Sequence, residues 1–287
     1  MRLVSYLSST GPRVAGVRQG QFVDLNANDP ALPSTMEALL AAGAEALTRA
    51  AEVTAKGKPL DGEVQLLAPV PRPGKVLCVG LNYADHARES GQQPPPEPVL
   101  FNKLLTAVSA PGAPIVVPRI SQEVDYEAEL VVVIGRQGRY IPEADALDYV
   151  AGYTVGNDVS ARDWQLRKPG GQWLLGKTFD GFAPFGPHLV TADEVGNPGK
   201  LRIQLRLNGQ TMQDSTTEQL IFSIDKLVAY VSQVCTLLPG DIIFTGTPPG
   251  VGAARKPPVF LKPGDVVEVE IEKLGVLRNP VVAEAAR

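Results

Sequence analysis

The sequence predicts a β-rich protein with few helices, built as a roll, sandwich or barrel behind a small N-terminal domain. Residues 201–207 and 267–272 alternate apolar and polar side chains, as half-buried strands do. Asn208-Gly209 directly follows the first of these stretches and is a strong hairpin signal. Residues 223–238, by contrast, carry apolar side chains at helical spacing.

Residues 1–70 form the predicted small α+β domain, and residues 71–287 form the main domain. Strand patterns occur around Leu3–Tyr6, Val14–Val17 and Phe22–Leu25. Thr35 can cap a helix from Met36 to about Lys56, where alanine and leucine dominate. Three prolines within residues 69–74 cannot continue a helix or a central strand, so we place the domain boundary there.

Composition argues against several classes of partner. The formal net charge is −4, which attracts neither nucleic acid nor an anionic membrane. The longest apolar stretches, such as Leu130–Ile134, fall far short of the roughly 20 residues that a membrane helix needs. The N-terminus lacks the apolar core of a signal peptide, and Cys78 and Cys235 lie in apolar surroundings typical of buried free thiols. We therefore expect a cytoplasmic protein with a small-molecule partner.

The most informative segment places acidic residues at alternate positions before an apolar run. Glu123, Asp125, Glu127 and Glu129 would share one face of a strand that continues into Leu130–Ile134 and is central and buried. Buried carboxylates side by side require either protonation or a cation. Oxygen ligands favour Mg²⁺, Mn²⁺ or Ca²⁺ over zinc. A solvated acidic edge strand accounts for the spacing equally well.

Asp158 is a candidate third ligand because it lies where a short apolar strand ends and a helical turn begins, although an N-cap role fits the same pattern. Lys177 lies among apolar and aromatic residues and could stabilise an enolate or carboxylate, unless it is a surface lysine. The glycine- and proline-rich residues 244–252 could hold a carboxylate or simply form a tight turn.

His86 and Glu89 are three residues apart in a short polar helix, so their side chains are neighbours. A carboxylate beside an imidazole fixes its tautomer and raises its basicity, which suits a general base that activates water. A surface pair explains the spacing too. The proline-rich residues 91–98 follow, and they suggest a lid that carries the base.

Taken together, these segments resemble the fumarylacetoacetate hydrolase superfamily. The matching motifs, in chain order, are residues 80–89, 125–130, 156–163, 176–180 and 245–252. The resemblance covers roughly residues 70–284, and the first 70 residues resemble the leading domain of two-domain bacterial members. Those relatives include acylpyruvate hydrolases, oxaloacetate decarboxylases and 2-oxo acid hydratases and isomerases.

The resemblance implies a mixed α/β, β-rich fold with a β-roll core, usually assembled as a homodimer. It implies a divalent cation, most often Mg²⁺, held by residues matching Glu127, Glu129 and Asp158. It further implies that His86 and Glu89 activate water and that Lys177 is catalytic. Substrate contacts are expected from Gln165, Thr247, Arg162 and Tyr83.

The activity implied first is hydrolysis of a C–C bond in a small 2,4-dioxo, acylpyruvate-type acid, because the His86–Glu89 pair is complete. Without water attack, the same residues would suit a lyase, such as an oxaloacetate-type decarboxylase or a sugar-acid dehydratase, and other relatives hydrate or isomerise. A non-catalytic acid-binding relative is a third possibility, which the intact carboxylates and the pair argue against.

Overall fold

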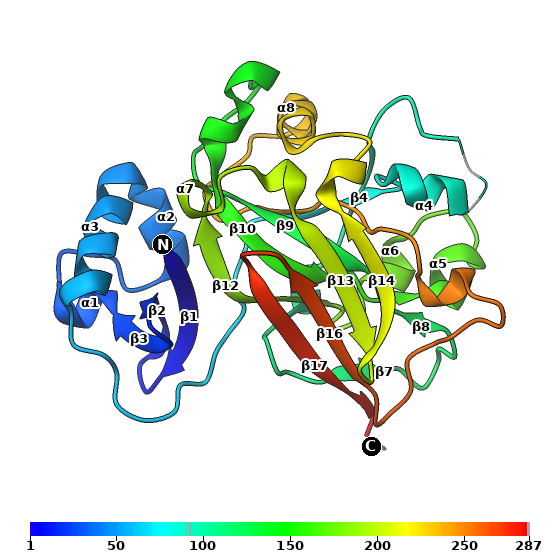
Figure 1. Ribbon diagram of the computed structural model, residues 1–287, viewed down its shortest axis with the longest axis horizontal. Helices are drawn as coiled ribbons and strands as arrows, with labels where there is room; N and C mark the ends of the chain where they lie inside the picture. The colour runs from blue at the N-terminus through cyan, green and yellow to red at the C-terminus, as the bar shows by residue number, and fades with distance from the viewer. Residues whose placement is uncertain (90, 92, 286–287) are drawn as a thin grey trace.

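The computed structural model describes residues 1–89, 91 and 93–285, and it shows a mixed, strand-rich fold as predicted. Its largest sheet has ten strands in the order β3-β2-β1-β12-β10-β9-β15-β4-β5, with β6 beside β12 (Figure 1). These strands are β1 Arg2–Ser8, β2 Gly11–Arg18, β3 Gln21–Asp24, β4 Val76–Gly80, β5 Val99–Asn102, β6 Val108–Ser109, β9 Ala128–Ile134, β10 Val150–Asn157, β12 Ala183–Thr191 and β15 Ile242–Phe244.

Two smaller sheets complete the β structure. The five-stranded sheet has the order β14-β13-β16-β17-β7, and β8 pairs with β11 alone. The strands are β7 Ile115–Val117, β8 Val124–Asp125, β11 Ser160–Ala161, β13 Arg202–Leu207, β14 Gln210–Thr216, β16 Val266–Ile271 and β17 Gly275–Ala283. The hairpin between β13 and β14 turns at Asn208 and Gly209, which have φ values of 52° and 81°, so the predicted turn is confirmed.

The helices are short and lie around the sheets (Figure 1). They are α1 Leu25–Asn28, α2 Met36–Ala41, α3 Gly43–Lys56, α4 Ala84–Glu89, α5 Arg162–Leu166, α6 Leu174–Lys177, α7 Ala192–Val195 and α8 Ile224–Val234. The 3-10 turns are η1 Leu105–Ala107, η2 Glu143–Tyr149, η3 Pro198–Lys200, η4 Thr217–Gln219 and η5 Gly252–Ala254. Among the described residues, no helix is long and apolar enough to cross a membrane.

Two helix predictions need correction. Thr35 caps the first helix as expected, but the helix breaks at Gly43, whose φ of 80° cannot continue it, so α2 and α3 replace one element. The helix after Ser223 ends at Val234 instead of Leu238. The reason is that Leu237 exchanges two backbone hydrogen bonds with Gly138, which requires extended backbone.

The N-terminal strands extend the main sheet, because β1 pairs with β12 through Arg2–Val190 and Leu3–Leu189. Figure 1 shows α1, α2 and α3 gathered around these strands, to one side of the larger part. The predicted domain boundary at residue 70 stays a prediction. Both cysteines are free, as expected, although Cys235 is only partly buried.

Strand β9 runs through the centre of the molecule and is buried along its whole length. Leu130 and Val132 pack into the core shared with β13 and β16, whereas Val131 and Val133 pack into the core shared with the N-terminal helices. Both faces of this strand are therefore covered, as predicted for the segment that follows the acidic residues. Carboxylates at the start of β9 consequently enter the interior of the protein.

Candidate active site

The ends of β9 and β10 bring three carboxylates together. The Asn157 side-chain oxygen accepts a 2.9 Å hydrogen bond from the backbone N–H of Glu127. The N–H of Asp158 in turn donates to the carbonyl of Glu127 at 2.9 Å. The carboxylates of Glu127, Glu129 and Asp158 are all buried, and one oxygen from each lies within 4.8 Å of the others. The structure thus assembles the predicted ligand set, and Asp158 is no N-cap, because Ala161 holds that position for α5.

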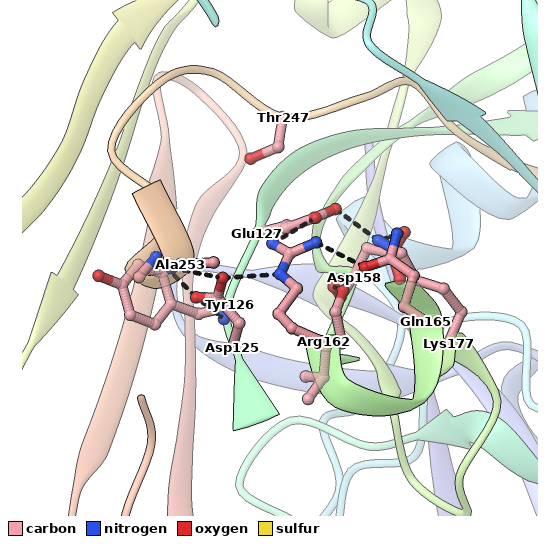
Figure 2. Close-up of polar contacts among 12 residues, drawn as sticks. Asp125, Tyr126, Glu127, Asp158, Arg162, Gln165, Lys177, Thr247 and Ala253 are labelled. Atoms are coloured by element: carbon pink, nitrogen blue, oxygen red, sulfur yellow. Dashed lines mark hydrogen bonds and ion pairs between the residues drawn. The ribbon is translucent and has the colours of Figure 1, made fainter. Parts of the chain in front are cut away.

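Lys177 binds two of these carboxylates directly. Its Nζ lies 2.8 Å from Glu127 Oε2 and 3.0 Å from Asp158 Oδ2 (Figure 2). Gly176 makes this approach possible, because a Cβ there would lie 2.4 Å from the backbone nitrogen of Gln165. The glycine lets α6 pack closely on α5, and Lys177 therefore points into the site and not to the surface.

Arg162 lies on the other side of Glu127 (Figure 2). Its Nε donates to Asp125 at 2.8 Å, and one terminal nitrogen forms a 2.8 Å ion pair with Glu127 Oε1. The second terminal nitrogen donates to the side-chain oxygen of Gln165 at 2.9 Å. Arg162 thus organises one edge of the site, and its contacts are mainly with other site residues.

Asp125 departs from the expected acidic face. Its carboxylate accepts hydrogen bonds from the backbone N–H groups of Gly252, at 2.7 Å, and Ala253, at 3.0 Å, besides the bond from Arg162. Glu123 lies farther out and pairs with Arg167. The expected single row of four acids is therefore wrong: the strand breaks at residues 126–127, and only Glu127 and Glu129 join Asp158.

Lys103 was missed by the sequence argument. It follows β5, is fully buried, and donates to the carboxylate of Asp158 and to the carbonyls of Val159 and Phe182. Three acceptors use all three N–H bonds of its ammonium group. Lys103 consequently fixes Asp158 and has no donor left for a substrate. An isolated lysine after a short strand carries no local signal of this role.

Burial and neighbouring charges shift the pKa values of the acidic cluster and of Lys177. Burial, reinforced by Asp158 and Glu127, holds the pKa of Glu129 well above its ordinary value. For Glu127, burial is outweighed by Lys177 and Arg162, which lower its pKa. Burial opposes the charge of Lys177, but Asp158 and Glu127 raise its pKa overall, so its ammonium group keeps its charge.

The donor set fits a hard divalent cation. Glu129 accepts a 2.7 Å hydrogen bond from the N–H of Gly246 and has no cationic partner among the described residues. Its raised pKa identifies it as the member of the cluster that lacks a compensating charge. Three buried carboxylate oxygens within reach of one another are ligands that Mg²⁺ or Mn²⁺ accepts, and the described part of the chain adds no sulfur or imidazole ligand to them.

The predicted pair of His86 and Glu89 lies on α4. His86 Nδ1 is 3.2 Å from Glu89 Oε2, and the Glu89 carboxylate also accepts from the N–H of Gly250 at 3.1 Å. Asp85 on the same helix accepts a 2.6 Å hydrogen bond from Ser215 of β14. These contacts hold α4 against the turn at residues 245–252, with His86 at the edge of the pocket.

A pocket of about 290 Å³ lies against His86, Glu127 and Lys177, whereas Glu129 and Asp158 are not among its lining residues. Its polar lining residues are His86, Glu127, Arg162, Gln165, Lys177 and Thr247, and its remaining wall is largely apolar, with Phe101 and Trp173 as its aromatic members. Tyr83 lies apart from these lining residues. Its side chain is fully buried in the main core and is not among the residues that line this pocket, so the expected substrate contact through Tyr83 stays a prediction.

Comparisons with known proteins identify the family. A family model described as fumarylacetoacetate (FAA) hydrolase C-terminal matches residues 75–282. Oxaloacetate tautomerase FAHD2A, mitochondrial, of Bos taurus is 52% identical over 98% of this chain and 92% of that protein. The structure of a fumarylacetoacetate hydrolase from Exiguobacterium antarcticum matches with a TM-score of 0.85 at 36% identity, covering 99% of this chain and 100% of the other.

A 5-carboxymethyl-2-hydroxymuconate delta-isomerase from Mycobacterium smegmatis matches with a TM-score of 0.79 at 36% identity, over 100% of both chains. Fold and sequence together define this chain as an enzyme. It belongs to the fumarylacetoacetate hydrolase family, as the resemblance predicted, and its relatives there include a tautomerase, a hydrolase and an isomerase.

Proposed function

We propose that this enzyme interconverts the keto and enol forms of a small 2-oxo dicarboxylic acid, with oxaloacetate as the first candidate substrate. The observation that carries the proposal is the donor arrangement at Lys177. Two of its three N–H bonds bind Glu127 and Asp158, and no described residue accepts a hydrogen bond from the third in the pocket that Lys177 lines. The name of the cattle relative, which spans nearly the whole chain, supports oxaloacetate as substrate.

Glu127, Glu129 and Asp158 would hold a divalent cation, for which Mg²⁺ is the expected choice. When bound, it would supply Lewis-acid polarisation of the 2-oxo group and charge compensation for the carboxylates. Without it, the four carboxyl groups of the site, including Asp125, face three cationic side chains, Lys103, Lys177 and Arg162. With all four carboxyl groups ionised, the bound cation would leave the site with a net positive charge, which suits an anionic substrate.

Lys177 and His86 would stabilise the enolate and transfer the proton. The available N–H of Lys177 can donate to the oxygen that becomes negative in the enolate, and a preformed donor there lowers the barrier. His86, oriented by Glu89, lies at the pocket edge and can transfer the proton that C3 gains or loses. Conversion of enol to keto form moves one proton from oxygen and adds one at C3, so the substrate's composition is unchanged.

The size of the pocket favours a compact substrate. A space of about 290 Å³ lies at the lower end of ligand pockets and suits an acid of few carbon atoms. The aromatic rings of Phe101 and Trp173 pack edge to face at 5.4 Å and close one side. Apolar walls exclude water, which strengthens the charge interactions inside.

The test follows formation of keto-oxaloacetate from the enol with malate dehydrogenase, which consumes the keto form, in Mg²⁺ and in EDTA. We expect an EDTA-sensitive acceleration above the uncatalysed rate, with no pyruvate released. Pyruvate release would identify a decarboxylase on the same site. A rate that equals the uncatalysed rate in Mg²⁺ would contradict the proposal.

Hydrolysis of an acylpyruvate is the second candidate, and the 3.2 Å contact between His86 Nδ1 and Glu89 supports it, because a carboxylate beside an imidazole suits a base that activates water. The protein would be mixed with an acylpyruvate in Mg²⁺ or EDTA while enol absorbance and pyruvate are measured. EDTA-sensitive loss of absorbance with pyruvate production supports hydrolysis. Unchanged absorbance in both conditions counts against it and leaves tautomerisation in place.

We also propose a homodimer. Leu104, Leu105 and Ile120 are large apolar side chains that are at least half exposed. Leu104 is tied to Thr178 by a 2.7 Å hydrogen bond, and Ile120 lines the same groove as Thr178. Light scattering after size exclusion tests this assembly, and a monomer at micromolar concentration would contradict it. A cytoplasmic location stays an expectation, because the name of the cattle relative places that protein in the mitochondrion.

A further inference from the structure

Gln213 connects the metal-ligand strand with the turn that carries Thr247. It lies in β14, is 1% exposed, and accepts a 2.9 Å hydrogen bond from the N–H of Ala128, between Glu127 and Glu129. Its amide nitrogen donates to Thr247 Oγ1 at 2.9 Å and to the carbonyl of Pro248 at 2.7 Å. One buried amide thus ties the acidic strand to the opposite wall of the pocket.

The two backbone partners fix which way this amide points. The N–H of Ala128 can only donate, so the Gln213 atom facing it is the oxygen. The carbonyl of Pro248 can only accept, so the Gln213 atom facing it is the nitrogen. The second N–H of that nitrogen therefore reaches Thr247, and the threonine oxygen accepts it.

The orientation of the Gln213 amide determines whether the Thr247 hydroxyl can donate a hydrogen bond. Its oxygen is occupied by a donor, so its own O–H must point elsewhere. Among the described residues, Gln213 is the only hydrogen-bond partner of the Thr247 side chain. Thr247 lines the pocket, and Figure 2 shows it across from Glu127 and Arg162 with its hydroxyl oxygen on the side that faces them.

We propose that Gln213 is a positioning residue that commits the Thr247 hydroxyl to donate a hydrogen bond to the carboxylate of the 2-oxo acid. The inference rests on the proposed function, since it assumes such an acid in this pocket. A preset donor selects an anionic oxygen and needs no reorientation when the substrate arrives. Gln213 acts through Thr247 and does not itself line the pocket.

The test uses binding of oxalate to the Mg²⁺-loaded protein by calorimetry, because oxalate offers the carboxylate without turnover. Thr247→Val removes the hydroxyl, whereas Thr247→Ser keeps it. Gln213→Glu keeps the acceptor for Ala128 but replaces the donor to Thr247 with an oxygen. Gln210→Glu makes the same change at an exposed position on the same strand and is the matched control.

We expect Thr247→Val and Gln213→Glu each to weaken oxalate binding roughly 10- to 100-fold, as loss of a hydrogen bond to a charged group does. Thr247→Ser and Gln210→Glu should bind as the wild type does. The double variant Gln213→Glu with Thr247→Val should bind as Thr247→Val alone, because Gln213 would have nothing left to orient. A merely structural Gln213 would weaken binding further in that background, and this result would overturn the proposal.

Other outcomes separate the inference from the proposed function. If no 2-oxo acid is turned over but oxalate shows this pattern, the proposed function fails and the inference stands. If tautomerisation is found but Thr247→Val binds oxalate normally, the inference fails alone. Wild-type protein that does not bind oxalate with Mg²⁺ overturns the inference. Should Gln213→Glu not fold, Gln213→Met, of similar length and without charge, takes its place in the cycle.

Discussion

Lys177 lies 2.8 Å from Glu127, and both side chains are buried beside Asp158. This ion pair places an ammonium group at the carboxylates that would hold a cation, and one of its N–H bonds has no acceptor among the described residues and could bind substrate. Lys103 binds the other carboxylate oxygen of Asp158, and its three N–H bonds all have protein acceptors. Two lysines beside one aspartate thus have different roles, and substitution should separate them.

Lys177→Met should reduce kcat for enol conversion about 100- to 1000-fold, because a preset donor to the developing enolate is lost. Steady-state kinetics on oxaloacetate in saturating Mg²⁺ would measure it. Lys226→Met, on the exposed face of α8, is the control and should leave kcat unchanged. A kcat for Lys177→Met within threefold of the wild type would remove Lys177 from the mechanism.

Lys103→Met should act chiefly on stability. It removes one of the two lysine partners of the buried Asp158 carboxylate and one donor to each of the Val159 and Phe182 carbonyls, and loss of one partner of a buried pair costs about 3–5 kcal/mol. Urea unfolding would show this loss, and saturating Mg²⁺ should reduce it, since the cation compensates Asp158. Equal unfolding free energies for the variant and the wild type without metal would contradict the role of Lys103.

Glu129 gives the metal-free site a pH dependence. Its folded-state pKa is raised by burial and by Asp158 and Glu127, so its contribution to stability is fully present below the unfolded pKa. That contribution is lost as the pH rises through the folded pKa, because the buried carboxyl must then ionise. In EDTA, Glu129→Gln should therefore lose less stability with rising pH than the wild type, as measured by melting temperature.

Mg²⁺ affinity should rise with pH in the wild type, since binding displaces the Glu129 proton. Glu129→Gln should bind Mg²⁺ much more weakly at every pH, and calorimetry would measure both. The matched control is Glu270→Gln on β16, where the carboxylate pairs with Arg206 outside the site. If Glu129→Gln retained wild-type Mg²⁺ affinity, Glu129 would not be a ligand.

His188 gives the fold a separate acid sensitivity. Burial, with the charge of Arg2, lowers its pKa from 6.5 to about 4. The unfolded chain therefore binds a proton first, and stability falls as the pH drops from about 6.5 to about 4. Between pH 7 and pH 5, His188 should account for roughly 2 kcal/mol of lost unfolding free energy. His188→Asn should lack this component in urea titrations, and an identical pH profile would contradict the assignment.

His86→Gln separates the two candidate activities. Hydrolysis requires a base that activates water, so the substitution should abolish acylpyruvate cleavage. Enol conversion should be slowed but retained through Lys177, with a residual EDTA-sensitive rate. Product analysis on both substrates would show the difference. Unchanged hydrolysis in His86→Gln would exclude this histidine as the base.

Sequence periodicity was sufficient for the strands that define the site. Alternate acids followed by an apolar run identified the buried central strand that carries Glu129 and is preceded by Glu127, because two-residue periodicity is a local property. Local pattern made Asp158 and Lys177 candidates, and the family motifs favoured their site roles over an N-cap and a surface lysine. Lys103 could not be predicted, since only packing of β5 against residues 158–159 and 182 gives it acceptors.

Other failures have similar physical causes. Gly43 interrupts a stretch of good helix formers because its φ angle is positive. Helix propensity averaged over the stretch does not reveal a single residue of this kind. The motif that contains Tyr83 gives no sign that this side chain is fully buried in the core. Gln213 has no motif at all, and its role appears only when β14, β9 and the turn at Thr247 are placed together.

All candidate activities share one step, formation of an enolate beside Lys177 and the three carboxylates. Exchange of the pyruvate methyl protons with D₂O, followed by proton NMR, measures that step without water attack or decarboxylation. We predict exchange well above the uncatalysed rate in Mg²⁺, lost in EDTA and strongly reduced in Lys177→Met. Exchange at the uncatalysed rate in saturating Mg²⁺ would contradict the account.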